Sequence, residues 1–153
     1  MAWQLYQFPL CPFSRKVRLL LGEKGEGCEL VRESPWDQRD EYVDMNPAGQ
    51  TPVLVDRGQN LVLIDSNAIC EYLEETVERT IMLPGTAANR AEVRRLVSWF
   101  DQKFHDEVGR PLLYERMEKR LVHRVSPDAK ALREAMRLAN SHLDYICLLY
   151  TSP

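Results

Sequence analysis

The chain has 153 residues, of which 44% are hydrophobic and 28% are charged, an ordinary globular composition that excludes disordered and collagen-like proteins. The net charge is -3, and it is unevenly spread: residues 1–80 carry 8 basic and 14 acidic side chains, whereas residues 109–153 carry 8 and 5. This small basic surplus, interleaved with acidic residues, does not predict a nucleic-acid partner.

The first part of the chain predicts a strand, a helix and a second strand, in that order. Residues 3–8 are rich in aromatic side chains and bounded by prolines, which is typical of a strand. Residues 14–24 have helical periodicity and end at glycines. Their inward face is expected to contain Val17, Leu20 and Leu21. Residues 28–33 are the second strand, and short connections between these elements predict a right-handed unit with two parallel strands.

The stretch RDEYVDMNPAGQTPVLV predicts at most a short helix, then a turn, then a strand that begins at Val53. Turn residues 56–60 separate PVLV from LVLI, so these two segments are expected to form a hairpin. Asp65 and Ser66 are cap residues for a following helix. The inward face of that helix is expected to contain Ala68, Ile69, Tyr72 and Leu73. The order βαβαββα in residues 1–80 predicts an α/β thioredoxin-like domain.

The periodicity changes after this domain. Residues 81–88, which include MLPG, are the expected linker, and residues 89–153 are the expected start of an all-α domain. Apolar side chains recur there at helical spacing in two segments. The first contains Val93, Leu96, Val97, Phe100 and Phe104, and the second contains Leu132, Met136, Ala139, Leu143 and Ile146. We therefore expect two long antiparallel helices.

The cysteine pattern and the hydropathy pattern exclude further classes. The four cysteines form no CxxC pair and have no His at metal-ligand spacing, so we expect reduced thiols and no metal. They are Cys11, Cys28, Cys70 and Cys147. No apolar run approaches the length of a membrane span, and the first residues lack the features of a targeting signal. We expect a cytoplasmic protein with no membrane partner.

Cys11 stands out because it lies at the turn between the first strand and the first helix. Unpaired backbone N–H groups and the positive end of the helix dipole favour a thiolate at this position. Three cationic residues follow within one or two turns: Arg15, Lys16 and Arg18. The alternative is a buried cysteine that serves as a small apolar side chain.

Several motifs together resemble the glutathione transferase superfamily. They are CPFS at residues 11–14, NPAGQTPVL at residues 46–54, LIDSNAICEYLEE from residue 63, and the MLPG linker. The resemblance covers nearly the whole chain, and CPFS is most similar to the cysteine-containing omega-like and bacterial members. It implies glutathione as cosubstrate, a small electrophile or a disulfide as second substrate, and a homodimer.

The resemblance also implies a role for individual residues. A cis bond before Pro52 would turn the backbone of Thr51 outward, where it can pair with the cysteinyl part of glutathione. The resemblance also places Phe13 at the glutathione site. Asp65 and Ser66 would hold the γ-glutamyl end; without the resemblance, a plain helix cap is the preferred explanation for this pair.

Two other assignments are more open. Gln38 or Arg39 would reach the glycyl carboxylate of glutathione, with a simple surface position as the alternative for Arg39. His105, at the start of a segment broken by Gly and Pro, would approach Cys11 from the second domain, as in some bacterial members; a surface or packing role is the alternative.

The residue at position 11 determines the chemistry that the resemblance implies. A cysteine can form a mixed disulfide with glutathione, which favours thiol transfer over simple conjugation. Ser14 occupies the position of the second cysteine of a dithiol motif, so a second glutathione would have to resolve the intermediate.

A second interpretation belongs to a different class of function. FPLCPFSRKVRLLLGEK and HLDYI also resemble glutathione-transferase-like scaffolds of bacterial cell division, which bind the tubulin-like division protein instead of turning over substrate. Asp65 and Thr51 replace the commoner Glu and Val of the family, which puts the affinity for glutathione in question. The family's helical domain is about twice as long as residues 89–153, and CLLYTSP breaks with the polar helix before it, so we expect a C-terminally truncated chain.

Overall fold

The computed structural model describes the backbone of residues 3–151 and the side chains of residues 3–149. The chain divides into two compact units, Met1–Pro84 and Gly85–Pro153. This division falls inside the segment 81–88 that was expected to be a linker. Residues 1–2 and 152–153, at the outer ends of the two predicted domains, lie outside the described part of the chain.

The first unit contains a four-stranded mixed sheet. Its strands are β1 (Trp3–Gln7), β2 (Cys28–Arg32), β3 (Val53–Asp56) and β4 (Leu61–Ile64). Their order in the sheet is β2-β1-β3-β4. Strand β1 runs parallel to β2 and antiparallel to β3, and β3 pairs antiparallel with β4. The structure therefore confirms both the parallel pair and the hairpin that the sequence predicts.

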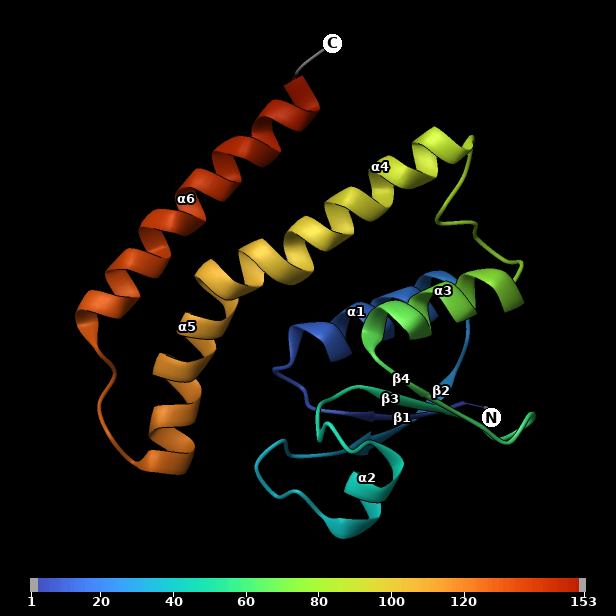
Figure 1. Ribbon diagram of the computed structural model, residues 1–153, viewed down its shortest axis with the longest axis horizontal. Helices are drawn as coiled ribbons and strands as arrows, with labels where there is room; N and C mark the ends of the chain where they lie inside the picture. Colours follow the sequence, from blue (N-terminus) through green and yellow to red (C-terminus); the bar gives the residue numbers. More distant parts are fainter. Residues whose placement is uncertain (1–2, 152–153) are drawn as a thin grey trace. The chain divides into compact units, whose positions relative to one another are not determined.

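Two helices, α1 (Pro12–Glu23) and α3 (Ser66–Thr76), cover one face of this sheet (Figure 1). The core between them is apolar and fully buried, and it contains Leu5, Val17, Leu21, Leu54, Ile69 and Leu73. Each such burial stabilises the fold by about 1.5–3 kcal/mol. The expectation for Ala68 was wrong, because this residue lies in the first turn of α3 and is exposed. Helical spacing locates the apolar stripe, but it does not show where the sheet ends beneath it.

The short helix α2 (Asp40–Met45) lies on the opposite face of the sheet (Figure 1). Its Tyr42 is 1% exposed, and the ring centroid of Tyr42 is 5.9 Å from that of Tyr6 on β1. Only one turn and a half of helix is present, so packing against the sheet, and not helix propensity, must hold it.

A buried lysine joins the C-terminal ends of α1 and α3. Lys24 is fully buried, and its Nζ donates to the carbonyl oxygens of Val77, Arg79 and Thr80 at 2.9, 3.4 and 3.2 Å. The same Nζ lies 2.8 Å from Oε2 of Glu74. A buried ammonium is tolerated only when it is paired and hydrogen-bonded, and both conditions are met here.

Glu74 extends this network to the end of the first unit. Its Oε1 accepts hydrogen bonds from the backbone N–H groups of Met82 and Leu83 at 2.8 and 2.9 Å. Burial of the carboxylate raises the pKa of Glu74, but the hydrogen bonds from Lys24 and from these two N–H groups lower it by more. The net result is a pKa below the ordinary value, so the carboxylate stays ionised and holds the segment that leads out of the unit.

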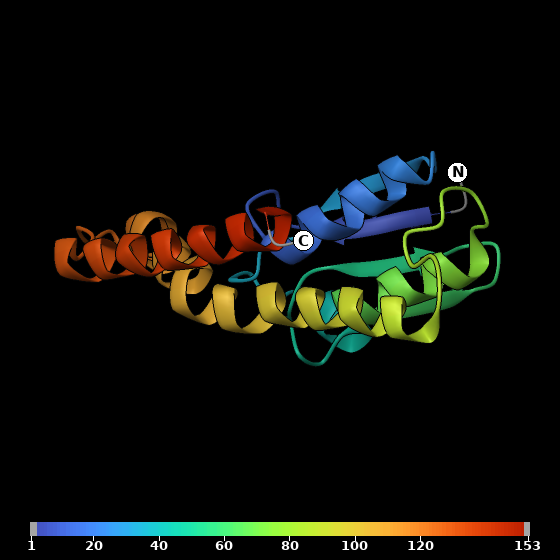
Figure 2. The ribbon, with the colours of Figure 1, turned by 90° about the horizontal axis from the view of Figure 1, so that it is seen from above.

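The described part of the second unit contains helices and their connections, and no strand. Helix α4 (Ala87–Ser98) begins with a capping box between Thr86 and Asn89. It continues through the π-helical stretch η1 (Trp99–Gly109), the turn α5 (Arg110–Leu113) and a second π-helical stretch η2 (Tyr114–His123). Arg124, in the left-handed conformation with φ 55°, ends this run. Helix α6 (Ala129–Thr151) then returns antiparallel to α4 and η1, as Figures 1 and 2 both show.

The sequence predicts that Gly109 and Pro111 break the helix after His105, and this prediction was wrong. Both residues lie within a continuous helical backbone, because the residues that flank α5 keep right-handed helical angles. The ribbon changes direction at α5 instead (Figure 1). A proline inside a helix removes one backbone hydrogen bond and produces this kind of bend.

The face of α6 that packs inward also differs from the expected stripe. Ala135 and His142 are buried, whereas Met136 and Leu143 are 48% and 54% exposed. Leu132, Ala139 and Ile146 are partly buried. Apolar periodicity alone predicts the stripe, and it gives no signal for a histidine in the buried row.

His142 can be buried at little cost in free energy because each of its ring nitrogens has a hydrogen-bond partner. Trp99 donates from Nε1 to Nδ1 of His142 at 3.1 Å, and Nε2 of His142 lies 2.9 Å from Oε2 of Glu107. An indole can only donate, so Nδ1 is an acceptor and the ring proton on Nε2 is donated to Glu107. The ring of Phe104 packs edge-on against the imidazole at 5.1 Å. This network joins α6 to η1.

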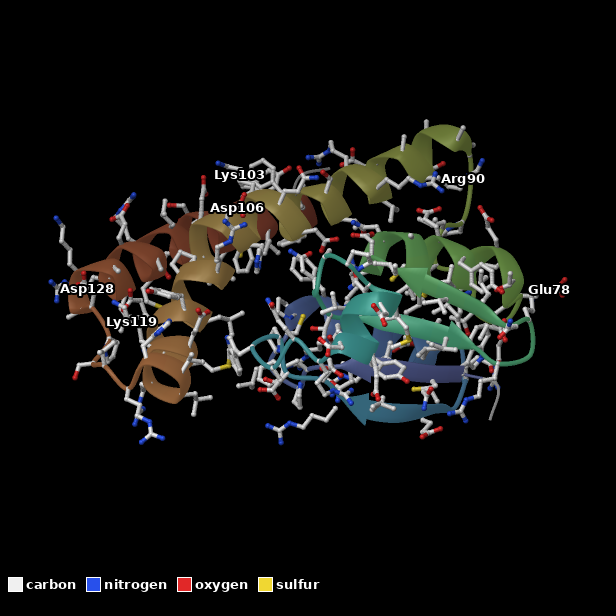
Figure 3. All side chains as sticks on the ribbon, turned by 60° about the horizontal axis from the view of Figure 1, so that its bottom comes forward. Glu78, Arg90, Lys103, Asp106, Lys119 and Asp128 are labelled. Atoms are coloured by element: carbon white, nitrogen blue, oxygen red, sulfur yellow. The ribbon has the colours of Figure 1, made fainter. Side chains whose placement is uncertain are left out.

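Charged side chains line the outer surface of the second unit. Figure 3 labels Lys103 and Asp106 on η1 and Lys119 on η2. Lys103 pairs with Glu107 one turn along the helix, and Lys119 lies 2.8 Å from Oε2 of the buried Glu115. The solvent-accessible Lys103–Glu107 pair contributes little to stability.

We expect the stability of the first unit to fall in acid because of Glu74. Its pKa is lower in the folded chain than in the unfolded chain, so its contribution is complete above the ordinary value of about 4.3 and is lost as the pH falls through the folded value. In urea titrations, the free energy of unfolding should therefore decrease below about pH 5 more steeply in the wild type than in Glu74→Gln. The exposed neighbour Glu75 provides the control, and Glu75→Gln should follow the wild type. Parallel curves for the wild type and Glu74→Gln would contradict this expectation.

Candidate functional site

Cys11 is the N-cap residue of α1. Its backbone is extended, with φ -74° and ψ 121°, and its Sγ accepts a hydrogen bond from the N–H of Ser14 at 3.4 Å. Pro12 occupies the first helical position, where a missing N–H costs nothing. The side chain is partly buried, and its sulfur meets the positive end of the helix dipole. This geometry matches the position that the sequence predicts.

The Ser14 side chain has a structural partner. The residue is fully buried, and its Oγ accepts a hydrogen bond from the N–H of Phe8 at 3.4 Å. The hydroxyl thus joins the end of β1 to the first turn of α1. A cysteine at this position would be enclosed in the same way.

The second partner of Cys11 comes from a distant part of the chain. Its S–H donates to the carbonyl oxygen of Thr51 at 3.4 Å. The Thr51–Pro52 bond is cis, as the family resemblance implies, and both residues are buried. The Cys11 sulfur is therefore an acceptor toward the N–H of Ser14 and a donor toward the carbonyl of Thr51.

The loop before Thr51 is held by two residues that sequence reasoning missed. Tyr42 donates from its hydroxyl, and Asn46 from Nδ2, to the carbonyl oxygen of Gln50, each at 2.6 Å. Burial raises the pKa of Tyr42 to about 12, so its hydroxyl remains a donor. Asn46 is detectable in sequence only as a turn residue before a proline, and Tyr42 only as one apolar residue of a short helix.

The N-terminus of α3 lies beside that of α1. Lys16 on α1 donates from Nζ to Oδ1 of Asn67, in the first turn of α3, at 2.9 Å. Asp65 is the exposed N-cap of α3, and its Oδ1 accepts from the N–H groups of Asn67 and Ala68 at 2.8 and 3.1 Å. The helix-cap role that the sequence left open for Asp65 is therefore present. Ser66 is 4% exposed.

The remaining predicted residues of the first unit lie around these helix ends. Phe13 follows Cys11 by two residues, and the Nζ of Lys16 lies 5.9 Å from the centroid of its ring. Gln38 is exposed and has a positive φ of 39°. Arg39 pairs with the buried carboxylate of Glu33, so its guanidinium already has an anionic partner. This pairing leaves Gln38 as the freer of the two candidates.

His105 lies on η1 in the second unit and is partly buried. Burial and the nearby charge of Arg110 lower the pKa of His105. A Cβ atom added to Gly109 would lie 2.9 Å from its Nδ1, so the small residue makes room for the ring. The structure therefore gives this histidine a packing environment within its own unit.

The described residues contain no group of three or more His, Cys, Asp or Glu side chains that could hold a metal ion. None of the helices described is both long enough and apolar enough to pass through a bilayer.

A thioredoxin-like sheet, a cysteine at the start of α1 beside a cis-proline loop, and a following helical unit are the features of the glutathione transferase fold. The sequence profile of the family described as "Glutathione S-transferase, N-terminal domain" matches residues 5–80. The solved glutathione S-transferase from Rhodospirillum rubrum F11 is 43% identical, with a TM-score of 0.93 over 98% of this chain and 67% of that chain. The chain belongs to the glutathione S-transferase superfamily.

Within this superfamily, the chain is also similar to a protein named for its localisation with FtsZ. FtsZ-localized protein A of Caulobacter vibrioides (strain NA1000 / CB15N) is 44% identical over 144 residues, which cover 93% of this chain. The chain spans 63% of that protein's length. The solved structure of FzlA from C. crescentus is 44% identical, with a TM-score of 0.94 over 99% of this chain and 68% of that chain.

We expect Cys11 to react faster with iodoacetamide near neutral pH than Cys28. Burial raises the pKa of Cys28, and the charge of Arg18 only partly offsets this effect, so the Cys28 thiolate is scarce until the pH is alkaline. Labelling is followed for each cysteine peptide by mass spectrometry across the pH range. Cys28 labelling should increase only at high pH. If Cys28 reacts as fast as Cys11 at neutral pH, Cys11 is not the activated thiol.

Proposed function

We propose that the protein transfers thiol groups with glutathione and that Cys11 is the nucleophile. The observation that carries this proposal is the position of the Cys11 sulfur at the N-terminus of α1, between the N–H of Ser14 and the carbonyl of Thr51. A cysteine thiol in this position attacks a disulfide more readily than it activates a bound thiol by hydrogen bonding.

The proposed reaction has two exchange steps. The Cys11 thiolate attacks the glutathione sulfur of a mixed disulfide, forms a disulfide with glutathione and releases the other thiol. The thiolate of a second glutathione then attacks the glutathione sulfur on Cys11, which yields oxidised glutathione and regenerates the Cys11 thiolate. The enclosed Ser14 hydroxyl cannot replace this second glutathione, because it is not a thiol and is fully buried.

Glutathione would bind along the edge formed by the N-termini of α1 and α3. The backbone of Thr51, next to Pro52, would pair with the cysteinyl part, and Phe13 would flank it. The γ-glutamyl end would lie at Asp65 and Ser66, where the first-turn N–H groups of α3 attract a carboxylate. Gln38 would reach the glycyl end. His105 would contribute from the second unit. Conjugation to a small electrophile is the related reaction at the same thiol.

The proposal extends to compartment and assembly. A catalytic thiol requires a reducing environment, which supports a role in the cytoplasm. We propose a homodimer because the family resemblance implies one and because the two units carry opposite charge excesses. Screening over about 8 Å at physiological salt means that apolar contacts must supply most of the affinity.

Substitution of Cys11 tests the main proposal. With glutathione and a glutathione mixed disulfide as substrates, Cys11→Ser should reduce turnover by about 100-fold or more, because serine cannot form the intermediate disulfide. Cys28→Ser is the matched control and should retain wild-type turnover. Intact mass spectrometry should detect glutathione on the wild type and on Cys28→Ser only. Full activity of Cys11→Ser would refute the role of this thiol.

A second candidate is a scaffold that binds the bacterial tubulin-like division protein without turnover. The observation that favours it is the 44% identity with FtsZ-localized protein A, a protein named for its localisation with FtsZ. Retention on a glutathione column with elution by free glutathione supports the enzyme. Co-sedimentation with polymers of the division protein, unchanged in Cys11→Ser, supports the scaffold.

A further inference from the structure

The carbonyl oxygen of Gln50 is the meeting point of two buried donors. The hydroxyl of Tyr42 and the Nδ2 of Asn46 each lie 2.6 Å from it, and both residues are 1% exposed. A carbonyl has two lone pairs, so these two donors satisfy it completely. Water cannot easily replace either donor at this depth.

Both donors belong to a small, internally bonded element. The Tyr42 ring packs against Tyr6 of the sheet, with the centroids 5.9 Å apart. Asn46 caps α2 by donating its N–H to the carbonyl of Tyr42 at 2.8 Å, and its Oδ1 accepts from the N–H of Ala48 at 3.2 Å. Gly49, with φ 63°, donates its N–H to the carbonyl of Asn46 at 2.8 Å. The loop is thus wound around Asn46.

Thr51 is the single residue that connects Gln50 to the hydrogen-bond acceptor of Cys11. The peptide unit between Gln50 and Thr51 is planar, so fixing the carbonyl of Gln50 also fixes the N–H of Thr51. The carbonyl of Thr51, the next along the chain, accepts the S–H of Cys11 at 3.4 Å. A shift of the loop would therefore move the acceptor away from the sulfur.

We propose that Tyr42 and Asn46 are positioning residues, which hold the Gln50–Thr51 segment against Cys11 and so restrain the reactivity of its thiol. The direction follows from the partner, because a carbonyl oxygen that accepts the S–H stabilises the protonated form. Burial keeps Tyr42 protonated, with a pKa raised to about 12, so the restraint persists at neutral pH. The charged groups that act on the Tyr42 hydroxyl are Glu33, which pairs with Arg39, and Cys11 itself; both also raise the pKa of Tyr42, after the larger effect of burial. This inference deepens the proposed site, but it does not depend on glutathione.

The test removes one donor at a time from the full chain. Tyr42→Phe keeps the ring and deletes the hydroxyl, and Asn46→Ala deletes the amide. Iodoacetamide labelling of each cysteine is measured by mass spectrometry across the pH range. In either variant, Cys11 should label roughly threefold faster at pH 7, and its labelling curve should move to lower pH, by the size of effect expected for one lost hydrogen bond. The double variant should exceed both single variants.

Two controls separate positioning from general loosening of the fold. Tyr72→Phe removes a hydroxyl that donates to Oδ2 of Asp56 at 3.1 Å, at the opposite end of β3, and it should leave the Cys11 curve unchanged. Cys28, in the same samples, reports on the rest of the unit. The proposal is overturned if the Cys11 curves of both single variants coincide with that of the wild type, or if Cys28 accelerates as much as Cys11. Turnover of glutathione by Cys11→Ser tests the proposed function, and its result is independent of the labelling curves.

Discussion

The packing of α1 and α3 against one face of the sheet is the constraint on which the rest of the first unit depends. Leu5 and Leu54 supply the sheet side of this core, and the helices bury two fully enclosed side chains each. Helix α1 follows β1 and α3 follows β4, and these two strands run in the same direction because each is antiparallel to β3. The N-termini of the two helices therefore meet at one edge of the sheet, where Lys16 bridges to Asn67. The positive ends of two helix dipoles are therefore brought together, which makes this edge suited to a thiolate and a carboxylate.

The thiol at this edge lies between two hydrogen-bond partners. The N–H of Ser14 donates to the Cys11 sulfur, and the carbonyl of Thr51 accepts from it. The first contact is local to the helix, and it comes with any N-cap cysteine. The second requires a loop 40 residues away in sequence. Under the proposed role of Tyr42 and Asn46, a change in the loop alters the reactivity of the Cys11 thiol without any change to the cysteine or its helix.

Each unit also contains a buried polar network that joins distant elements. Lys24 and Glu74 join the ends of α1 and α3 to the segment that leaves the first unit. His142 joins α6 to Trp99 and Glu107 of η1 in the second unit. Buried groups of this kind are costly when a partner is removed, so each network disfavours alternative packings of its unit.

The sequence by itself determined the elements of the first unit and the position of Cys11. These depend on local signals: alternation in short strands, turn residues between β3 and β4, and a cysteine between prolines before a helix. The cis bond before Pro52 followed from the family resemblance, not from any pattern in the residues. Tertiary structure decided that Ala68 is exposed, that α6 buries His142, and that the helix bends at α5 instead of breaking. It alone brought Tyr42 and Asn46 to Gln50, and Arg39 to Glu33. The physical reason is that a hydrogen bond inside a protein depends on which distant groups share a desolvated space, and no local periodicity encodes that pairing.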